Sequence, residues 1–357
     1  MINLELEYKP DAPRVAERME AYWHRTILDR ATIQVRAPKP VQHPYPVKKH
    51  PTLRDRWMDV DYQVECALTG CSNIWYGGEI LPYFDPNLGP ESLTAAFGAP
   101  LEFGEGTSWS VPILNNWDDM ETLRFDPQVD YIQTLLKMIR TGLQAGRGKF
   151  VVGYTDIHPG GDLAASLRDP QQLCIDLVNE PDRVRELLER IHNSFFDIYL
   201  LEEAIFKEYG QPISASWLPL FDTGRYYIPS NDFSCMISKQ MFIDFFIPEL
   251  LDEIEFLDRS IYHLDGPDAL RHLDTLLDIP NLDAIQYVCG AGDGPSSRWM
   301  DVFKRIQNAG KCIWVDVSPD EIELFMENLK PEGVMMCTWV PTIEEGEAIL
   351  KRIASWK

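Results

Sequence analysis

The second half of the chain alternates between short apolar runs and longer amphipathic ones. Six runs rich in β-branched and aromatic residues have the length of strands, and we predict strands at 149–156, 212–218, 260–264, 282–288, 311–317 and 333–339. Between them apolar residues recur at i, i+3, i+4 and i+7, which predicts helices within 169–210, 238–258, 267–278, 296–310, 318–330 and 342–357. Strand–helix alternation of this kind is typical of parallel β/α units.

The first 147 residues are less regular, with proline-rich connections at 38–52 and 82–100 and a helix expected at 126–146. A chain of 357 residues has the length of a β/α barrel that folds as one domain. We therefore predict an α/β fold, a (β/α)8 TIM-type barrel over 1–357, in which residues 1–72 form an N-terminal extension packed on the barrel. A doubly wound sheet is the alternative, although no GxGxxG motif follows a predicted strand.

The composition limits the classes of partner. The chain has 33 Lys+Arg against 56 Asp+Glu, a net charge of −23, which opposes binding to nucleic acid and to anionic membrane surfaces. No stretch approaches the roughly 18 uninterrupted apolar residues of a membrane span, and the N-terminus lacks a signal-peptide pattern, so we expect a cytoplasmic protein. The seven cysteines are dispersed without a CxxC pair, which argues against a disulfide framework.

Candidate chemistry gathers where the predicted strands end. In "RSIYHLDGPD" (259–268), His263 and Asp265 are two residues apart on one strand, so their side chains share a face and form a candidate catalytic pair. Functional residues of β/α barrels cluster at the carboxyl ends of strands. A hydrogen-bonded structural role is the alternative for a histidine at this position. The other polar or aromatic residues at strand ends are Asp156, His158, Trp217, Gln286, Cys289, Asp316, Cys337 and Trp339.

Further candidates lie in loops and turns. His158 stands between Asp156 and Asp162 in a glycine-containing turn, where it would act as a general acid or base or would stabilise the turn. Aromatic side chains near strand ends would line an apolar or cation-binding pocket, or would belong to the core; they are Trp75, Tyr76, Trp109, Trp217 and Trp339. Asp232 and Gln286 are additional substrate-binding candidates.

Ordered blocks of the sequence resemble the uroporphyrinogen decarboxylase superfamily, which contains decarboxylases and cobalamin-dependent methyltransferases. The blocks include "GKFVVGYTDIHPGGDLAASLRDPQQL", "DFSCMISKQMFIDFFIPELLDEI", "SIYHLDG" and "GVMMCTWVPTIEEGEAIL". The resemblance covers roughly residues 75–355 and implies a β/α barrel, in agreement with the strand pattern.

The decarboxylase branch binds its many-carboxylate tetrapyrrole with arginines in a motif of the type "MRQAGR". The corresponding region of this chain is "RATIQVRAPKP", which does not match that motif. Glu79 in "GGEILPYF" lies where the decarboxylases carry an aspartate that contacts the pyrrole nitrogens, so Glu79 is a substrate-binding candidate by resemblance.

The methyltransferase branch carries a zinc site of the form H-x-C followed far downstream by C. This chain has H-x-D at 263–265, and Cys337 stands where the distant cysteine is expected. The resemblance therefore implies zinc bound by His263, Asp265 and Cys337, with the fourth position open to a substrate thiol.

The predicted function is a corrinoid-linked methyltransferase acting on a small methylated substrate or on methylcobalamin. A corrinoid protein and a second copy of the chain are the expected partners. Another metal-dependent lyase, decarboxylase or hydrolase on the same barrel, or a non-catalytic small-molecule binding protein, are the alternatives.

Overall fold

The computed structural model describes residues 4–290, 292 and 294–357. Its largest sheet has seven strands, and all neighbours in it are parallel except β2 and β1. In spatial order the strands are β2 (Ile74–Gly78), β1 (Thr32–Pro38), β13 (Val334–Trp339), β12 (Cys312–Asp316), β11 (Ala284–Val288), β10 (Arg259–Asp265) and β9 (Tyr226–Tyr227). The α/β class predicted from the alternating pattern is therefore confirmed.

The remaining strands form three separate pairs. They are β3 (Tyr83–Phe84) with β6 (Val151–Val152), β4 (Leu101–Phe103) with β5 (Ser108–Ser110), and β7 (Ser214–Ala215) with β8 (Phe221–Asp222). The described residues thus do not form one closed eight-stranded sheet. Several of these strands are only two residues long, and prolines, which donate no backbone hydrogen bond, stand close to β3 and β7 at Pro82 and Pro212.

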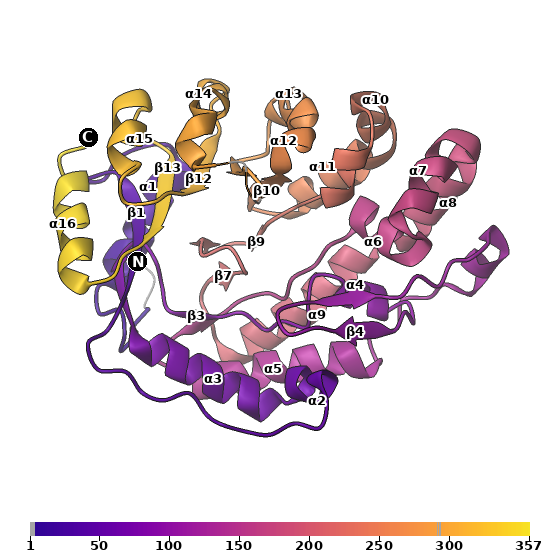
Figure 1. Ribbon diagram of the computed structural model, residues 1–357, viewed down its shortest axis with the longest axis horizontal. Coiled ribbons are helices and arrows are strands. Elements are labelled where there is room, and N and C mark those ends of the chain that lie inside the picture. Colours follow the sequence, from indigo (N-terminus) through magenta and orange to yellow (C-terminus); the bar gives the residue numbers. More distant parts are fainter. Residues whose placement is uncertain (1–3, 291, 293) are drawn as a thin grey trace.

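Helices surround the strands in the view of Figure 1. The longer ones are α1 (Ala12–Trp23), α3 (Val60–Asn73), α5 (Asp130–Ala145), α6 (Gly160–Arg168), α7 (Pro170–Asn179), α8 (Pro181–Ile191), α9 (Ser194–Tyr209), α11 (Ile247–Phe256), α14 (Met300–Asn308), α15 (Ile322–Asn328) and α16 (Ile343–Ile353). Short helices are α2 (Leu53–Met58), α4 (Ser92–Ala95), α10 (Lys239–Met241), α12 (Gly266–Ala269) and α13 (Leu273–Leu277). Within the described residues, no helix is both long enough and apolar enough to cross a membrane.

Local sequence explains the helix boundaries. The segment 169–210, within which helices were predicted, is divided into α7, α8 and α9. Asp169 caps α7 by accepting hydrogen bonds from the backbone N–H groups of Gln171 and Gln172, and α8 starts at Pro181. Helix α8 buries Val184, Leu187, Leu188 and Ile191, the spacing that places one apolar stripe on the core.

The N-terminal region contributes more than an extension. Strand β1 lies inside the large sheet, hydrogen-bonded to β13 on one side and to β2 on the other. Residues 32–38 are therefore part of the central sheet, which corrects their assignment to an extension over 1–72; residues 1–3 of that predicted extension lie outside the described residues. The β propensity of "TIQVRAP" was the available signal.

Side chains alternate between the two faces of the large sheet, and each face packs in its own apolar cluster. Ile261, Ala284, Trp314, Met335 and Cys337 belong to one apolar cluster, which also includes residues of α1. The alternate positions on the same strands pack toward the helices in a second, larger cluster. Because His263 and Asp265 are two and four residues after Ile261, they continue the inward-facing row beyond the apolar layer.

Candidate functional site

His263 is held by a neighbouring strand. The register of β10 and β11 sets His263 opposite Gln286, and Nδ1 of the histidine lies 2.8 Å from Oε1 of the glutamine. The amide oxygen can only accept a hydrogen bond, so Nδ1 is the donor and Nε2 is the ring nitrogen that remains to bind an ion. Nε2 lies 3.8 Å from Oδ1 of Asp232. The ring therefore presents a ligand atom or a proton acceptor to the space beside Asp232.

Asp232 is positioned by the turn that follows β9. The backbone N–H groups of Asp232 and Phe233 donate to the carboxylate of Asp162 at 3.0 and 2.8 Å, which fixes the start of a 3-10 turn over Asp232–Met236. The Asp232 side chain is 44% exposed, yet its Oδ1 atom is buried and has no hydrogen-bond partner. Burial, together with the charge of Asp162, raises the pKa of Asp232 to about 6.

Two groups of potential metal ligands share this aspartate. Asp232, His263 and Asp265 each offer a ligand atom, and these atoms lie within 4.8 Å of one another; His158, Asp162 and Asp232 form the second such group. The first group offers one imidazole nitrogen and two carboxylate groups, a donor set that zinc accepts. The unpartnered Oδ1 of Asp232 and the fixed tautomer of His263 fit a divalent ion at this point.

His158 is embedded between carboxylates. Its Nε2 lies 3.0 Å from Oδ1 of Asp156, and its Nδ1 lies 3.5 Å from Oδ2 of Asp162. Burial alone would lower the pKa of His158, but the two aspartates outweigh it and raise that pKa well above the usual value. The imidazole is therefore cationic at neutral pH. Of the two predicted roles, general acid or general base, this protonation state favours the acid.

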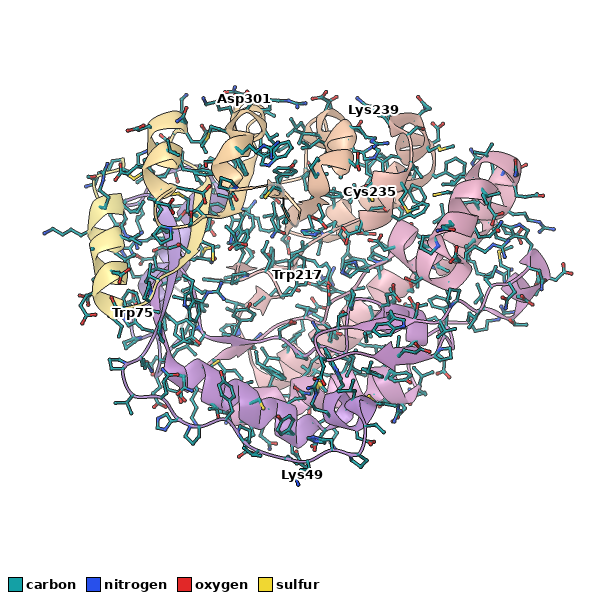
Figure 2. The ribbon with its side chains drawn as sticks, viewed as in Figure 1. Lys49, Trp75, Trp217, Cys235, Lys239 and Asp301 are labelled. Atoms are coloured by element: carbon teal, nitrogen blue, oxygen red, sulfur yellow. The ribbon has the colours of Figure 1, made fainter. Side chains whose placement is uncertain are left out.

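Two cavities meet at His158 and Pro90, which line both. The larger, of about 490 Å³, is lined by Trp57, Trp217, Asp156, His263 and parts of the loops 87–90 and 106–107. The smaller, of about 330 Å³, is lined by Asp162, Asp232, Phe233 and Met236 among others. The ring of Trp217 meets His263 edge-on, with centroids 5.3 Å apart, and Figure 2 shows Trp217 near the middle of the molecule. His158, Asp162 and Asp232 thus all line the smaller cavity.

Cys337 does not join His263 and Asp265. Its thiol is buried, and Nη2 of Arg36 donates to Sγ at 3.7 Å from β1. Burial, followed by the charge of Asp316, raises the pKa of Cys337 to about 12. In the described residues the three predicted zinc ligands are not assembled, and Asp232 stands beside His263 and Asp265 where the cysteine was expected. The strand-end position of Cys337 is as predicted, but its contacts are made with Arg36 and Asp316.

Three of the predicted substrate-binding residues lie elsewhere. Glu79 is completely buried, and its carboxylate accepts hydrogen bonds from Arg18 and Arg30 at 2.6–3.1 Å, so its charge is already compensated. Trp109 is 46% exposed and donates its indole N–H to Glu102. Trp339 is 50% exposed, with the guanidinium of Arg36 5.6 Å from its ring centre. These three side chains are not among the residues that line the two cavities.

The structure adds residues that sequence reasoning missed. Trp57 from α2 and Asn87 line the larger cavity. Asp85 follows β3 directly, and burial together with the charge of Asp156 raises its pKa to about 7. The sequence did contain a signal for Asp85. In "PYFDP" this aspartate directly follows an aromatic pair, as the other candidate residues follow their predicted strands.

Comparison with known proteins gives a likeness of fold. No protein-family model and no curated protein sequence matches the chain. A solved structure of a methyltransferase from Methanosarcina mazei is similar, with a TM-score of 0.62 and 12% sequence identity, and the match covers 94% of this chain and 97% of that chain. At this identity the likeness concerns the fold, over almost the full length of both chains.

Proposed function

We propose that this protein is a metal-dependent methyltransferase whose site is formed by Asp232, His263 and Asp265. The observation that carries the proposal is the convergence of these three ligand-type side chains beside a tryptophan-lined cavity. The overall fold, which is similar to that of a methyltransferase from Methanosarcina mazei, supports the same class of activity. We include in this proposal that the fold is an eight-stranded TIM-type barrel.

Zinc is the ion we propose, held by Nε2 of His263 and the carboxylates of Asp232 and Asp265. When bound, zinc lowers the pKa of a coordinated thiol, so that a thiolate is available to accept a methyl group near neutral pH. Two carboxylates and a neutral imidazole carry the same charge, minus two, as the implied set of histidine, aspartate and cysteine. Exchange of the cysteine for Asp232 therefore keeps the charge balance.

The chain's own groups orient the substrate and the ligands. Gln286 fixes the ring plane and tautomer of His263 through the 2.8 Å hydrogen bond. Trp57 and Trp217 give the larger cavity apolar faces that suit a methyl group or a methylated cation. His158, held cationic by Asp156 and Asp162, lies at the junction of the cavities, where the two aspartates compensate its charge.

The methyl donor we propose is a corrinoid, either methylcobalamin itself or a methylated corrinoid protein. This part of the proposal follows from the superfamily resemblance over residues 75–355. The two cavities, of about 490 and 330 Å³, suit the small thiol that accepts the methyl group, and the corrinoid would present its methyl group from outside them. Porphyrinogen decarboxylation is disfavoured, because the carboxylate of Glu79 is paired with two arginines and is not free to contact pyrrole nitrogens.

One observation favours a second function, a metal-dependent lyase or hydrolase. Carboxylate ligands are harder donors than thiolates, and a zinc ion with one nitrogen and two oxygen-donor groups is a strong Lewis acid that activates water. The absence of a thiolate from the described ligand group therefore leaves hydrolysis or elimination as the competing reaction class.

Metal analysis and a methyl-transfer assay test both functions. Protein purified without chelator is analysed for zinc and then mixed with methylcobalamin and ethanethiol, and demethylation of the corrinoid is followed by absorbance. We expect about one zinc per chain and thiol-dependent demethylation, both lost in His263→Ala. The matched control is Asp268→Asn, an exposed aspartate three residues beyond Asp265. Bound zinc without methyl transfer would favour the second function, and absence of zinc would contradict both.

A further inference from the structure

A small cavity lies behind the candidate site, between α11, the start of α6 and strand β10. Glu249 and Glu253 are one turn apart on α11, so both carboxylates point to this cavity, and Asn231 and Tyr262 complete its polar lining. Glu249 is 7% exposed and Glu253 is 4% exposed. The functional site described above uses neither glutamate.

The oxygen atoms in this cavity lack partners. Oε1 of Glu249, Oε2 of Glu253 and Oδ1 of Asn231 are buried without a hydrogen-bond donor. Among the described residues, the basic group that contacts Glu249 is His192, whose Nδ1 lies 3.8 Å from Oε1 of Glu249 and which also pairs with Asp252. Among the described residues, no lysine or arginine forms an ion pair with either glutamate. Two buried carboxylates therefore share at most one partial positive charge, which is costly unless something else compensates them.

The backbone around the cavity is shaped to approach these oxygens closely. Gly160 has φ of +58°, and a Cβ atom there would lie 3.0 Å from Oε2 of Glu249. A Cβ atom on Gly161 would lie 2.5 Å from Nδ2 of Asn231. A π-helical turn over Phe242–Phe246 leads into α11, and such turns occur frequently at functional sites. Glycines and an irregular helix thus permit an oxygen-lined space that ordinary packing would close.

The size and the charge of the cavity indicate its occupant. It offers about 10 Å³, room for one water molecule or one dehydrated ion. The hydroxyl of Tyr262, which also has no partner, can donate to one of the three unpartnered acceptors and a water molecule to the other two, but neither supplies positive charge to the two carboxylates. A cation satisfies all three acceptors and neutralises the glutamates. Magnesium keeps several of its water molecules and needs more room than this.

We propose that this cavity binds one calcium ion through Glu249, Glu253 and Asn231. Both carboxylates used with two oxygens each, the amide oxygen of Asn231 and the hydroxyl of Tyr262 supply about six oxygen ligands, the lower end of the number that calcium takes. The two carboxylates match the charge of a divalent ion. This site is separate from the group of Asp232, His263 and Asp265, and the proposal does not depend on the proposed methyl transfer.

Calcium here is a positioning ion for the candidate site. Asn231 directly precedes Asp232, and Gly161 directly precedes Asp162, whose carboxylate fixes the Asp232 turn. An ion that holds Asn231 against α11 would therefore limit the movement of the backbone next to Asp232 and Asp162. We expect bound calcium to raise the free energy of unfolding and, to a smaller extent, to fix the position of Asp232.

The test uses the full chain after treatment with EGTA and dialysis. Calcium chloride is then added, and bound calcium and melting temperature are measured. We expect one calcium per chain and a rise in melting temperature of about 4 °C at saturating calcium. Glu253→Gln should lose the rise, whereas Glu255→Gln, the same change on an exposed position of the same helix, should keep it. His263→Ala should also keep it, which separates this ion from the proposed zinc.

Other outcomes overturn the proposal. If the wild-type chain retains no calcium and its melting temperature does not respond, the cavity holds protonated carboxyl groups instead, and Glu253→Gln would then melt at or above the wild-type temperature. A response to sodium chloride but not to calcium at equal ionic strength would assign a monovalent ion and contradict the divalent site. The calcium content of the wild-type chain decides the question even if Glu253→Gln does not fold.

Discussion

Oε1 of Gln286 accepts a hydrogen bond from Nδ1 of His263 at 2.8 Å, across the neighbouring parallel strands β10 and β11. The register of the two strands places Gln286 beside His263. The hydrogen bond therefore engages Nδ1 of the ring and leaves Nε2 to face the site. A metal-binding histidine commonly has this kind of partner on its second nitrogen, and removal of the partner costs about 10–100-fold in affinity.

Replacement of Gln286 should therefore weaken metal binding without unfolding the chain. We expect Gln286→Leu to lower zinc affinity by about 10–100-fold, because the ring of His263 loses its orientation and its fixed tautomer. A competition titration with a chromogenic chelator measures the affinity. Gln171→Leu, at an exposed position on α7, is the control. Equal affinities for Gln286→Leu and the wild type would show that His263 does not bind zinc through Nε2.

The position of Cys337 separates two possible ligand sets. Its thiol is protonated at neutral pH, with its pKa raised to about 12, and it contacts Arg36 rather than His263. We expect Cys337→Ser to keep the full zinc content of the wild type, whereas Asp232→Asn should lose most of it. Elemental analysis of the two purified variants measures this. A large loss of zinc in Cys337→Ser would restore the set of His263, Asp265 and Cys337.

Part of this site was predictable from sequence because it depends on local geometry. The strand period of two places His263 and Asp265 on one face, and the structure brings their ligand atoms within 4.8 Å of each other. Asp232 reaches the same point from a 3-10 turn held by Asp162, a contact across 70 residues that no local pattern encodes. The long-range fold, rather than propensity, therefore decides which carboxylate accompanies the pair.

The wrong partners predicted for Cys337 and the omission of Asp85 have one cause. The strands near the N-terminus are short or occur in proline-rich sequence, so period and length did not identify them. Arg36 on β1, the partner of Cys337, was consequently assigned to an extension, and Asp85 was not recognised as a residue that follows a strand. The α/β class survived these errors because it depends on the long, regular elements after residue 148.

A buried carboxyl group away from the site should dominate part of the pH dependence of stability. Glu202 on α9 is completely buried and accepts hydrogen bonds from the backbone N–H and the hydroxyl of Thr155 at 3.0 and 2.5 Å. Burial raises its pKa from 4.5 to about 7. The folded state therefore binds this proton more tightly than the unfolded state does. The resulting stabilisation is complete below pH 4.5 and is lost as pH rises through about 7.

Glu202→Gln should remove this dependence. The amide keeps the shape of the side chain without the charge, so we expect the variant to become more stable relative to the wild type as pH rises from 5 to 8, by up to about 3 kcal/mol. Urea unfolding at several pH values measures the difference. Glu203→Gln, whose carboxylate pairs with Arg225 and Lys207 and has a lowered pKa, should show the opposite sign or no gain. A difference that does not vary with pH would contradict the raised pKa of Glu202.

Conversion of Asp265 to cysteine tests the site against the pattern that suggested it. Asp265→Cys recreates the H-x-C spacing of the methyltransferases that the sequence resembles, while His263 and Asp232 remain in place. A thiolate is a softer ligand than a carboxylate, so we expect zinc to be retained or bound more tightly and manganese to be bound more weakly than by the wild type. Competition titrations with both ions measure the change, and Asp265→Asn, which removes the charge without adding sulfur, should lose affinity for both. If Asp265→Cys and Asp265→Asn bind zinc equally well, residue 265 does not touch the ion. His263 and Asp232 would then act on the substrate as an acid–base pair beside Trp217, which is the arrangement that their 3.8 Å separation also permits.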